Sequence, residues 1–368
     1  MKRITVVIVL LVTLSLLIAS SMASVLATNN IIVIKNTQIT TNSQYDRDPS
    51  IFRASDFTYW LFFARGRDSR QIRDFNGYNP DLDYYDIYYK TAKFLPGLEK
   101  ASETKIPLTP PDNAQRDISA LQTKNGIIWV FTSTGLGEGT ERSIYYYTYD
   151  GSWHGPTAIP GTDDAAHISV LEDRGQIWVF FDIGYILQLV SCDENTAAWS
   201  SPIIVAAGPS GEGATIGKAI ADKGRFYVVW TTPSGSGIYI STSADGISWS
   251  STTNPIAAWT GATNWDPVLI KDYDLFRLFW APDGGNEGQF LATTASKNPM
   301  KETSWSTPVK VTTSSSGGNN WWDYWPQPYT QLIQYLFYTS ERNTTGTNRI
   351  DGNIWMMQLI LIPMPGKP

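Results

Sequence analysis

The sequence predicts an all-β fold, a six-bladed β-propeller built from four-stranded antiparallel blades. One aromatic-rich strand pattern, such as YWLFFA or IWVFFD, occurs six times, at 59–64, 128–133, 177–182, 226–231, 276–281 and 334–339. The second residues of these segments are 69, 49, 49, 50 and 58 residues apart: Trp60, Trp129, Trp178, Tyr227, Arg277 and Tyr335. Short strands repeating at a period of roughly 50 residues are typical of propeller blades.

Each repeat contains further strand-like segments around this one. The preceding segments are DPSIFR, DISALQ, HISVLE, KAIADK, DPVLIK and PQPYTQ, and the following ones are DIYYKT, SIYYYT, ILQLVS, GIYIST, QFLATT and NIWMMQ. A fourth strand comes after a turn, as in TAIP, PIIV and PVKVT. The last repeat ends close to the C-terminus, so we expect IIVIKN (31–36) to form the outermost strand of the sixth blade and close the ring.

Composition agrees with this fold and narrows the function. The 368 residues are 42% hydrophobic and 17% charged, so the chain can bury a large core. Fifteen Trp and nineteen Tyr, together with 29 Gly and 21 Pro, favour many short strands joined by tight turns. The formal net charge of −6 argues against a nucleic-acid partner, which requires a basic face. With two His and one Cys, neither a metal site nor a His-based triad is expected, and no cofactor is indicated.

Residues 1–27 have the pattern of a secretory signal peptide. Lys2 and Arg3 precede a long apolar run, and Val25-Leu26-Ala27 offers a small-residue cleavage site. An uncleaved membrane anchor is the alternative, because residues 4–27 are nearly long enough to span a bilayer. In either case we expect 28–368 to form a single propeller domain, a monomer that is secreted or held at the cell surface. The lone Cys192 cannot form an internal disulfide, which is more typical of an exported prokaryotic protein.

A second signature marks the turn between the third and fourth strands of a blade. The clearest copy is SADGISW, 243–249, in which Asp245 can accept backbone N–H groups, Gly246 can adopt a positive φ and Trp249 can pack on the hairpin. Looser copies are Asp150-Gly151 before Trp153, Asp193 before Trp199, and Ser296 before Trp305, the last without the Asp. These turns resemble the Asp-box of sialidase-like propellers.

Strand order predicts which face carries the chemistry. In an antiparallel blade the start of the inner strand and the end of the second strand lie on the same face, opposite the Asp-box turns. The inner-strand starts supply Arg47, Asp48, Arg116, Asp117, His167, Lys218, Trp265, Asp266, Trp325 and Gln327. The second-strand ends supply Arg65, Arg67, Asp68, Asp182, Asp283, Glu341 and Arg342. Carboxylates, arginines and aromatic rings around a central depression suit a sugar, because the rings stack on pyranose faces and the charges fix hydroxyl or carboxylate groups.

The first blade resembles that of exo-sialidases. The segment Arg47-Asp48-Pro49-Ser50-Ile51 is followed by FFARGR, a long insert and DIYY. The resemblance implies that Arg47 is the first carboxylate-binding arginine and Arg67 a supporting one. It requires two more arginines from later blades, for which Arg116 and Arg342 are available at matching strand ends. It also implies an acid among Asp68, Asp74, Asp81 and Asp83, with Tyr324 (or Tyr329) as nucleophile and Glu341 as its base.

A second resemblance involves the Asp-Pro strand starts. "DRDPSI" and "NWDPVLI" are similar to the strand starts of five-bladed furanosidase propellers, which use several inward-facing carboxylates. On that likeness Asp48, Asp117 and Asp266 would carry out proton transfer or electrostatic stabilisation. Carboxylates held close together push their pKa values apart, and a carboxylate pair is the usual minimum for glycoside hydrolysis.

Two functional hypotheses follow. The first is an exported, sialidase-like glycoside hydrolase, in which Asp48, Asp117, Asp266, Tyr324 and Glu341 are the candidate catalytic residues. The candidate substrate-binding residues are Arg47, Arg65, Arg67, Arg116, His167, Asp182, Trp265 and Arg342. The second is a non-catalytic propeller that binds a surface carbohydrate or protein, because one fold hosts many functions.

Overall fold

The computed structural model describes residues 31–41, 44–66, 85–108, 113–136, 142–284, 288–312, 315–316, 319–320, 322–330, 334–341 and 352–361. The predicted signal or anchor segment lies outside the described residues, as do Arg67, Arg342 and the insert residues Asp68, Asp74, Asp81 and Asp83. Within the described ranges, no helix has the length and apolar character needed to cross a membrane.

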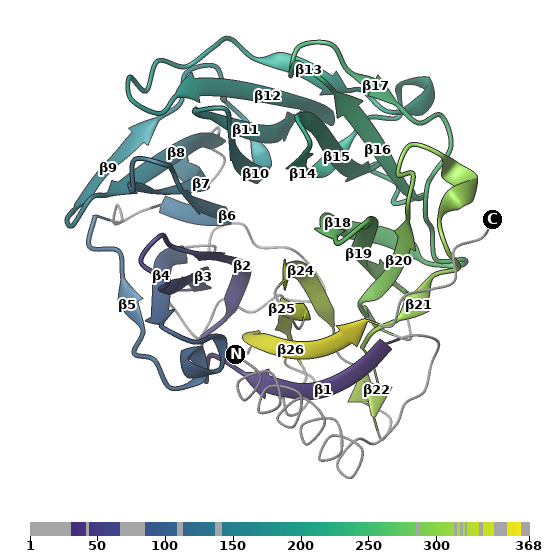
Figure 1. Cartoon of the computed structure of the whole chain (residues 1–368), viewed down its shortest axis with the longest axis horizontal. Coiled ribbons are helices and arrows are strands. Elements are labelled where there is room, and N and C mark those ends of the chain that lie inside the picture. Colours follow the sequence, from purple (N-terminus) through teal and green to yellow (C-terminus); the bar gives the residue numbers. More distant parts are fainter. Residues whose placement is uncertain are drawn as a thin grey trace, which may run out of the picture.

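The structure is a six-bladed β-propeller, as predicted (Figure 1). From the axis outward, blade 1 contains β2 (Asp46–Arg53), β3 (Tyr59–Gly66), β4 (Tyr85–Ala92) and β5 (Thr104–Lys105). Blade 2 contains β6 (Asn113–Gln122), β7 (Ile128–Leu136), β8 (Arg142–Tyr149) and β9 (Trp153–Ala158). Blade 3 contains β10 (Ala166–Asp173), β11 (Gln176–Ile183), β12 (Ile186–Asp193) and β13 (Ile203–Ala206).

The second half of the ring repeats this order. Blade 4 contains β14 (Thr215–Asp222), β15 (Arg225–Thr231), β16 (Ile238–Ser243) and β17 (Ser250–Ser251), and blade 5 contains β18 (Thr263–Asp272), β19 (Leu275–Asp283), β20 (Ala292–Ser296) and β21 (Val309–Lys310). Blade 6 contains β24 (Asp323–Thr330), β25 (Gln334–Ser340), β26 (Asn353–Leu361) and β1 (Ile31–Gln38). The connections include the 3₁₀ turns η2 (Leu95–Glu99), η3 (Pro209–Gly211) and η5 (Glu302–Ser304), and the short hairpin β22 (Ser315–Ser316) and β23 (Asn319–Asn320).

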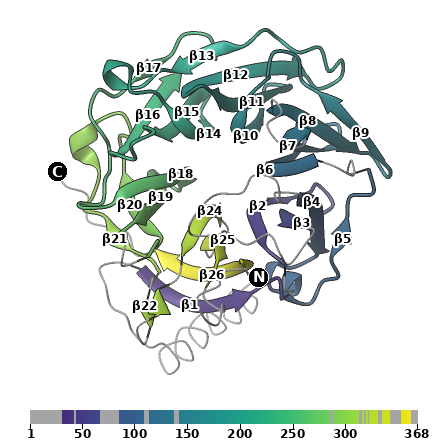
Figure 2. The same ribbon diagram turned by 180° about the vertical axis from the view of Figure 1, so that it is seen from behind.

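Strand β1 closes the ring, which confirms the predicted role of the N-terminal strand. It pairs antiparallel with β26, with Ile31 opposite Leu361 and Gln38 opposite Trp355. Figures 1 and 2 show the purple β1 beside the yellow β26, so the first and last described segments of the chain share one sheet. The closure continues past the strand, because the backbone N–H of Ile39 donates to the carbonyl of Ile354 at 2.8 Å.

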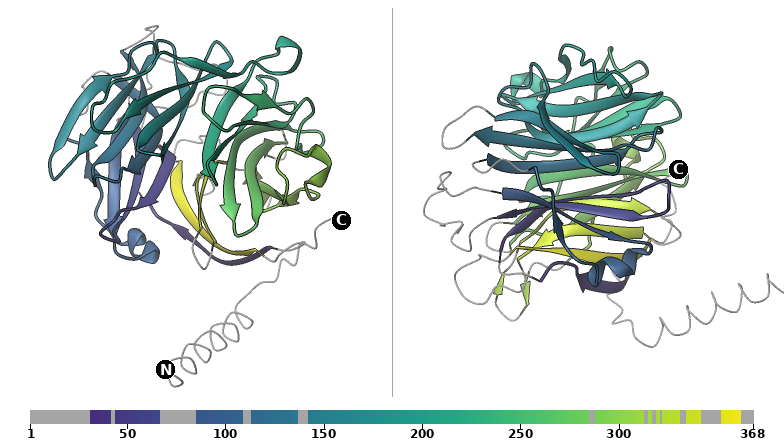
Figure 3. Two further views of the ribbon diagram at one scale, coloured as in Figure 1. Left: turned by 45° about the horizontal axis from the view of Figure 1, so that its top comes forward. Right: turned by 90° about the vertical axis from the view of Figure 1, so that its left-hand side faces the viewer.

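The core lies between neighbouring blades, whose sheets pack face to face (Figure 3). Between blades 2 and 3, for example, Phe131 of β7 packs in one buried cluster with Ile168 of β10 and Val179 of β11. The repeated aromatic strands are therefore the second strands of the blades, whose side chains are buried on both faces. Burial of these large apolar surfaces holds each blade to the next.

Every inner strand carries a bulge at the same place. The pairing of the first and second strands shifts register between Arg47 and Ser50, between Arg116 and Ser119, and at the matching points of the other four blades. One residue in each bulge has a positive φ of 50° to 54°: Asp48, Asp117, His167, Ile216, Asp266 and Trp325. Such a φ is uncommon outside glycine, so its sixfold repetition marks a constraint of the fold.

The closure of the ring leads to a stability prediction. Ile39 is 1% exposed and packs in the cluster formed by blades 6 and 1, whereas Ile34 of β1 is 38% exposed. We expect Ile39→Ala to lower the free energy of unfolding by about 2–5 kcal/mol, because it leaves a cavity in the core. Ile34→Ala is the matched control and should change it by less than about 1 kcal/mol. Urea unfolding followed by tryptophan fluorescence measures both; a loss for Ile39→Ala as small as that expected for Ile34→Ala would show that the packing of Ile39 does not secure the ring.

Candidate functional site

The six bulge residues surround one depression at the propeller axis. Its lining contains all six of them together with the residues that follow, notably Pro49, Ile118, Lys218, Pro267, Pro326 and Gln327. The floor has about 30 Å³ of free volume, room for a few water molecules, and the space including the open mouth is about 430 Å³. The floor could therefore admit only a small group at the end of a larger ligand.

Three of the lining carboxylates also join one blade to the next, each through a hydrogen bond from the backbone N–H of the following bulge residue; we call this interblade hydrogen bond a clip. Oδ2 of Asp48 accepts the backbone N–H of Asp117 at 2.9 Å, and Oδ2 of Asp117 accepts that of His167 at 3.1 Å. Oδ2 of Asp266 accepts the N–H of Trp325 at 3.3 Å. Within the described part of the chain these bonds occupy Oδ2 only, and Oδ1 of all three carboxylates makes no hydrogen bond. The positions predicted as catalytic thus serve the scaffold and still keep one oxygen for a ligand.

The three carboxylates differ in pKa because their surroundings differ. Burial raises the pKa of Asp266 to about 6, against the pull of the Trp325 N–H and the positive charge of His167. Burial acts in the same direction on Asp117, but the charges of His167 and Arg47 outweigh it and bring the pKa of Asp117 to about 2. Burial also raises the pKa of Asp48, despite its ion pair with Arg47. One cavity therefore holds a carboxyl that keeps its proton in mild acid and another that is charged over the same range.

His167 occupies the third bulge position. There the carboxylate that accepts the N–H of the next bulge residue comes from Asp182 and not from the bulge itself. Nδ1 of His167 lies 2.8 Å from Oδ1 of Asp182, which also accepts the backbone N–H of Ile216 at 3.3 Å. Burial lowers the pKa of His167, but the charge and hydrogen bond of Asp182 raise it by more, so that the pKa is about 9. Asp182 is 5% exposed, so it positions His167 from below the surface. The imidazolium and Lys218 bring positive charge among the carboxylates, and Lys218 donates to the carbonyl of Ile168 at 2.6 Å.

Two largely buried arginines from neighbouring blades, Arg47 and Arg116, lie outside the lining of the depression, and Arg47 contacts two of its lining residues. The guanidinium of Arg47 lies 3.9 Å above the ring of Trp325 and 2.9 Å from Oδ2 of Asp48. The guanidinium of Arg116 lies 5.8 Å from the ring of Tyr85, and that of Arg47 lies 5.5 Å from the same ring. The structure therefore brings Arg47 and Arg116 to one aromatic side chain, that of Tyr85.

Tyr324 and Glu341 are in direct contact. The hydroxyl of Tyr324 donates to Oε1 of Glu341 at 2.9 Å, and the hydroxyl of Tyr45 donates to the same oxygen at 3.3 Å. The Tyr324 ring lies 4.4 Å from that of Trp325, so this pair adjoins the depression. Tyr324 is 2% and Glu341 is 1% exposed, however, so the pair is buried beneath the surface that a ligand would touch.

Two other predicted binding residues lie apart from the depression. Arg65 is 6% exposed; Nε and Nη2 both donate to Asp46, at 2.7 and 3.0 Å, and Nη1 donates to Glu103 at 2.6 Å. We therefore assign Arg65 to the framework of blade 1 rather than to substrate binding. Trp265 precedes the bulge residue Asp266 and is half-buried, with its indole N–H donating to Thr263.

Sequence reasoning missed part of this geometry. It took Lys218 as the start of the fourth inner strand, but the residue equivalent to Asp48 is Ile216, which shares the bulge and the positive φ. Lys218 stands two residues later, where blades 1 to 3 have serines that accept backbone N–H groups from the next blade. Tyr85 was also missed, because it follows the long insert and its neighbours come from other blades. Among the described residues, no group of three or more His, Cys, Asp or Glu side chains could hold a metal ion.

Comparisons with known proteins support the fold. No protein-family model and no curated protein sequence match the chain. Among solved structures, a Dyadobacter fermentans protein of unknown function is similar over 91% of this chain and all of its own, with a TM-score of 0.69 and 13% identity. The phage phi92 endosialidase has a TM-score of 0.60 at 9% identity, covering 91% of this chain and 70% of its own. Trypanosoma rangeli sialidase has a TM-score of 0.59 at 12% identity, covering 86% of this chain and 55% of its own. The chain therefore has the fold of the sialidase-like propellers.

The His167–Asp182 pair leads to a prediction about pH. A histidine whose pKa is raised on folding adds stability that is fully present below its unfolded pKa, about 6.5, and is lost as the pH rises to about 9. We expect the thermal midpoint to fall over this range, and to fall less in His167→Gln. The effect is reduced by solvent screening, since 35% of the His167 side chain is exposed. Differential scanning calorimetry at a series of pH values tests this; identical slopes in both proteins would contradict it.

Proposed function

We propose that this protein is a glycan-acting propeller, a glycoside hydrolase whose reaction takes place at the central depression. The observation that carries the proposal is the pairing of Asp266 and Asp117 in one cavity with pKa values of about 6 and about 2. Glycoside hydrolysis requires one carboxyl that holds a proton and one that is charged. The sialidase and endosialidase among the structurally similar proteins agree with a glycan as the substrate class.

Each carboxylate then has a distinct task. Asp266, protonated below about pH 6, donates its proton to the oxygen of the leaving sugar. Asp117 remains charged and stabilises the positive charge that develops on the reacting sugar ring, or activates the attacking water. Asp48 holds Arg47 in place through their ion pair at 2.9 Å. We prefer these groups to the Tyr324–Glu341 pair, because that pair is almost fully buried.

The surroundings of the depression favour a glycan end group that carries a carboxylate. Arg47 and Arg116 meet at Tyr85, and arginine recognises carboxylates through paired hydrogen bonds. Trp325 lies between Arg47 and the depression and is half-buried, so part of its ring can stack on a sugar face. Export to the cell surface or the medium, inferred from residues 1–27, belongs to the same proposal.

Asp266 is the first residue to test. We expect Asp266→Asn to lower kcat by about 10²–10⁴ on whichever substrate in a fluorogenic glycoside panel the wild type cleaves, because an amide cannot donate the proton. The panel should include sialic acid, uronic acid and arabinofuranose glycosides. Asp163→Asn is the matched control, since Asp163 is exposed and, among the described residues, its side chain accepts a hydrogen bond only from the Ser143 hydroxyl. A wild type that cleaves no member but still binds glycans on an array would favour the binding-protein hypothesis instead.

The pH dependence of the same assay separates the two carboxyl roles. With the proton donor at a pKa of about 6, kcat/KM should be level in mild acid and fall about tenfold per pH unit above pH 6. The level region should extend down towards pH 2, as far as the fold permits, because Asp117 stays charged there. Activity that instead rises between pH 6 and 8 would exclude Asp266 as the proton donor.

The carboxylate-binding part of the proposal rests on Arg116. We expect Arg116→Gln to raise KM about tenfold or more for substrates with a carboxylate, and to leave KM for neutral glycosides within about twofold. Steady-state kinetics on paired charged and neutral glycosides measures the difference. Equal losses on both classes would assign Arg116 to the framework, as we assign Arg65.

A further inference from the structure

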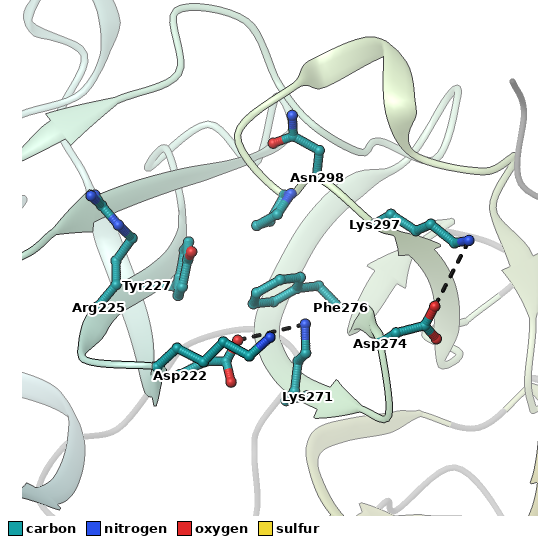
Figure 4. A pocket seen from close by; sticks show the side chains of 10 residues that line it. Asp222, Arg225, Tyr227, Lys271, Asp274, Phe276, Lys297 and Asn298 are labelled. Atoms are coloured by element: carbon teal, nitrogen blue, oxygen red, sulfur yellow. Dashed lines mark ion pairs between the residues drawn. The ribbon is translucent and has the colours of Figure 1, made fainter.

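A second hollow lies on the opposite face of the propeller, between blades 4 and 5. Its free volume is about 530 Å³, within the range of small-ligand pockets. The first turns of the two blades and the end of β20 form it, contributing Asp222, Lys223, Arg225, Lys271, Asp274 and Lys297 (Figure 4). Tyr227 and Phe276 lie between these charged groups (Figure 4). Asn298 and Pro299 also line the hollow.

Comparison with the preceding blade junction shows why the hollow is open. Tyr227 and Phe276 have centroids 4.9 Å apart and are the counterparts of Trp178 and Phe226, 4.8 Å apart, between blades 3 and 4. There the SADGISW turn covers the pair: Gly246 lies so close to the Trp178 ring that a Cβ would collide with it. Only glycine permits that approach.

The corresponding turn of blade 5 differs. It runs from Ser296 to Trp305, is three residues longer and includes η5, with Pro299 in the place of Gly246. The indole of Trp305 donates to the carbonyl of Pro299 as that of Trp249 donates to Gly246, so the two turns are equivalent. Because a proline stands where the close-packing glycine would be, the turn leaves the ring of Tyr227 half-buried at the hollow, although Phe276 beside it is only 4% exposed.

The side chains around the hollow carry a net positive charge, although the chain as a whole is acidic. Four cationic side chains and two carboxylates line it, whereas the chain has a formal net charge of −6. Lys271 is already held in place, 3.5 Å from Asp222 and with its ammonium 3.8 Å from the centre of the Phe276 ring. Among the described residues Lys223 and Arg225 form no ion pair, and Arg225 makes only a 3.5 Å bond to the Thr242 hydroxyl. The hollow therefore has positive charge available to a ligand.

The geometry points to a binding site for an acidic oligosaccharide in this hollow, separate from the depression at the axis. Its carboxylate or sulfate groups would pair with Arg225 and with Lys297, which stand at opposite ends (Figure 4). The exposed ammonium of Lys297 lies 3.8 Å from Asp274, so the ligand would compete with that ion pair. Its hydroxyls would bond to Asn298, Asp222 and Asp274, and a sugar face would lie over the half-exposed Tyr227. The two carboxylates disfavour a denser polyanion such as a nucleic acid, which offers few hydroxyl donors.

Isothermal titration calorimetry of the full chain tests this site. The probes are an oligogalacturonate for carboxylate, a heparin-derived oligosaccharide for sulfate, a malto-oligosaccharide as the neutral arm and a single-stranded DNA oligomer as the nucleic-acid arm. We expect saturable binding of at least one acidic sugar at low salt. In the double variant Arg225→Gln, Lys297→Gln, its affinity should fall about tenfold or more. Binding should also weaken as salt is raised from about 0.05 to 0.5 M.

Controls separate this site from the proposed reaction and from general charge. Lys93→Gln removes an exposed lysine near the β2–β3 turn, on the same face, and should leave the affinity unchanged. Asp266→Asn should also bind the acidic sugar as the wild type does, so loss of catalysis leaves the inference standing. Absence of binding by both acidic sugars, equal binding of the neutral sugar, stronger binding of DNA, or an unchanged affinity in the double variant would each overturn it.

Discussion

The bulge at the start of each inner strand is the constraint on which the rest of the molecule depends. At a positive φ, the residue in the bulge turns towards the axis, and the strand then resumes its pairing with the next one. In four of the six junctions a carboxylate on this face receives the backbone N–H of the following bulge residue. That N–H would otherwise be left without a partner in the bulge, so the carboxylate satisfies it and fixes the angle between blades.

The same arrangement generates the electrostatics of the depression. Burying several carboxylates around a narrow axis raises the pKa values of Asp48 and Asp266, and the neighbouring like charges add to this effect. His167 and Arg47 offset this at Asp117 and keep it charged. Among the described residues, a scaffold requirement thus yields one carboxyl that is protonated in mild acid and one that is ionised over the same range. Because the interblade hydrogen bond uses one oxygen of each group, the other oxygen remains available to a ligand.

The repeat was sufficient to predict the fold, because hydrophobic periodicity is local and recurs six times. The six second strands, the four-stranded blades and the closing strand at the N-terminus all follow from it. The site was predicted in part: Asp48, Asp117, His167 and Asp266 share a register that the strand starts reveal. The bulge cannot be recognised from residue type, because Asp, His, Ile and Trp all occupy it. Ile216 was missed for that reason. The environment of Arg65 depends on Glu103 from a later connection, which no local pattern indicates.

In a repeat protein, departures from the repeat are more informative about ligands than the repeated residues are. At the axis, His167 and Trp325 replace the aspartate of other blades, and each brings a chemical group that the clip does not require: an imidazolium, and a ring beneath Arg47. Between blades 4 and 5, Pro299 replaces a glycine and leaves the ring of Tyr227 half-buried among cations, beside the buried Phe276. A turn that served only to join strands would gain stability by sealing that pair, as SADGISW does one blade earlier. The open hollow gives up this apolar burial, and binding of a ligand there would restore it.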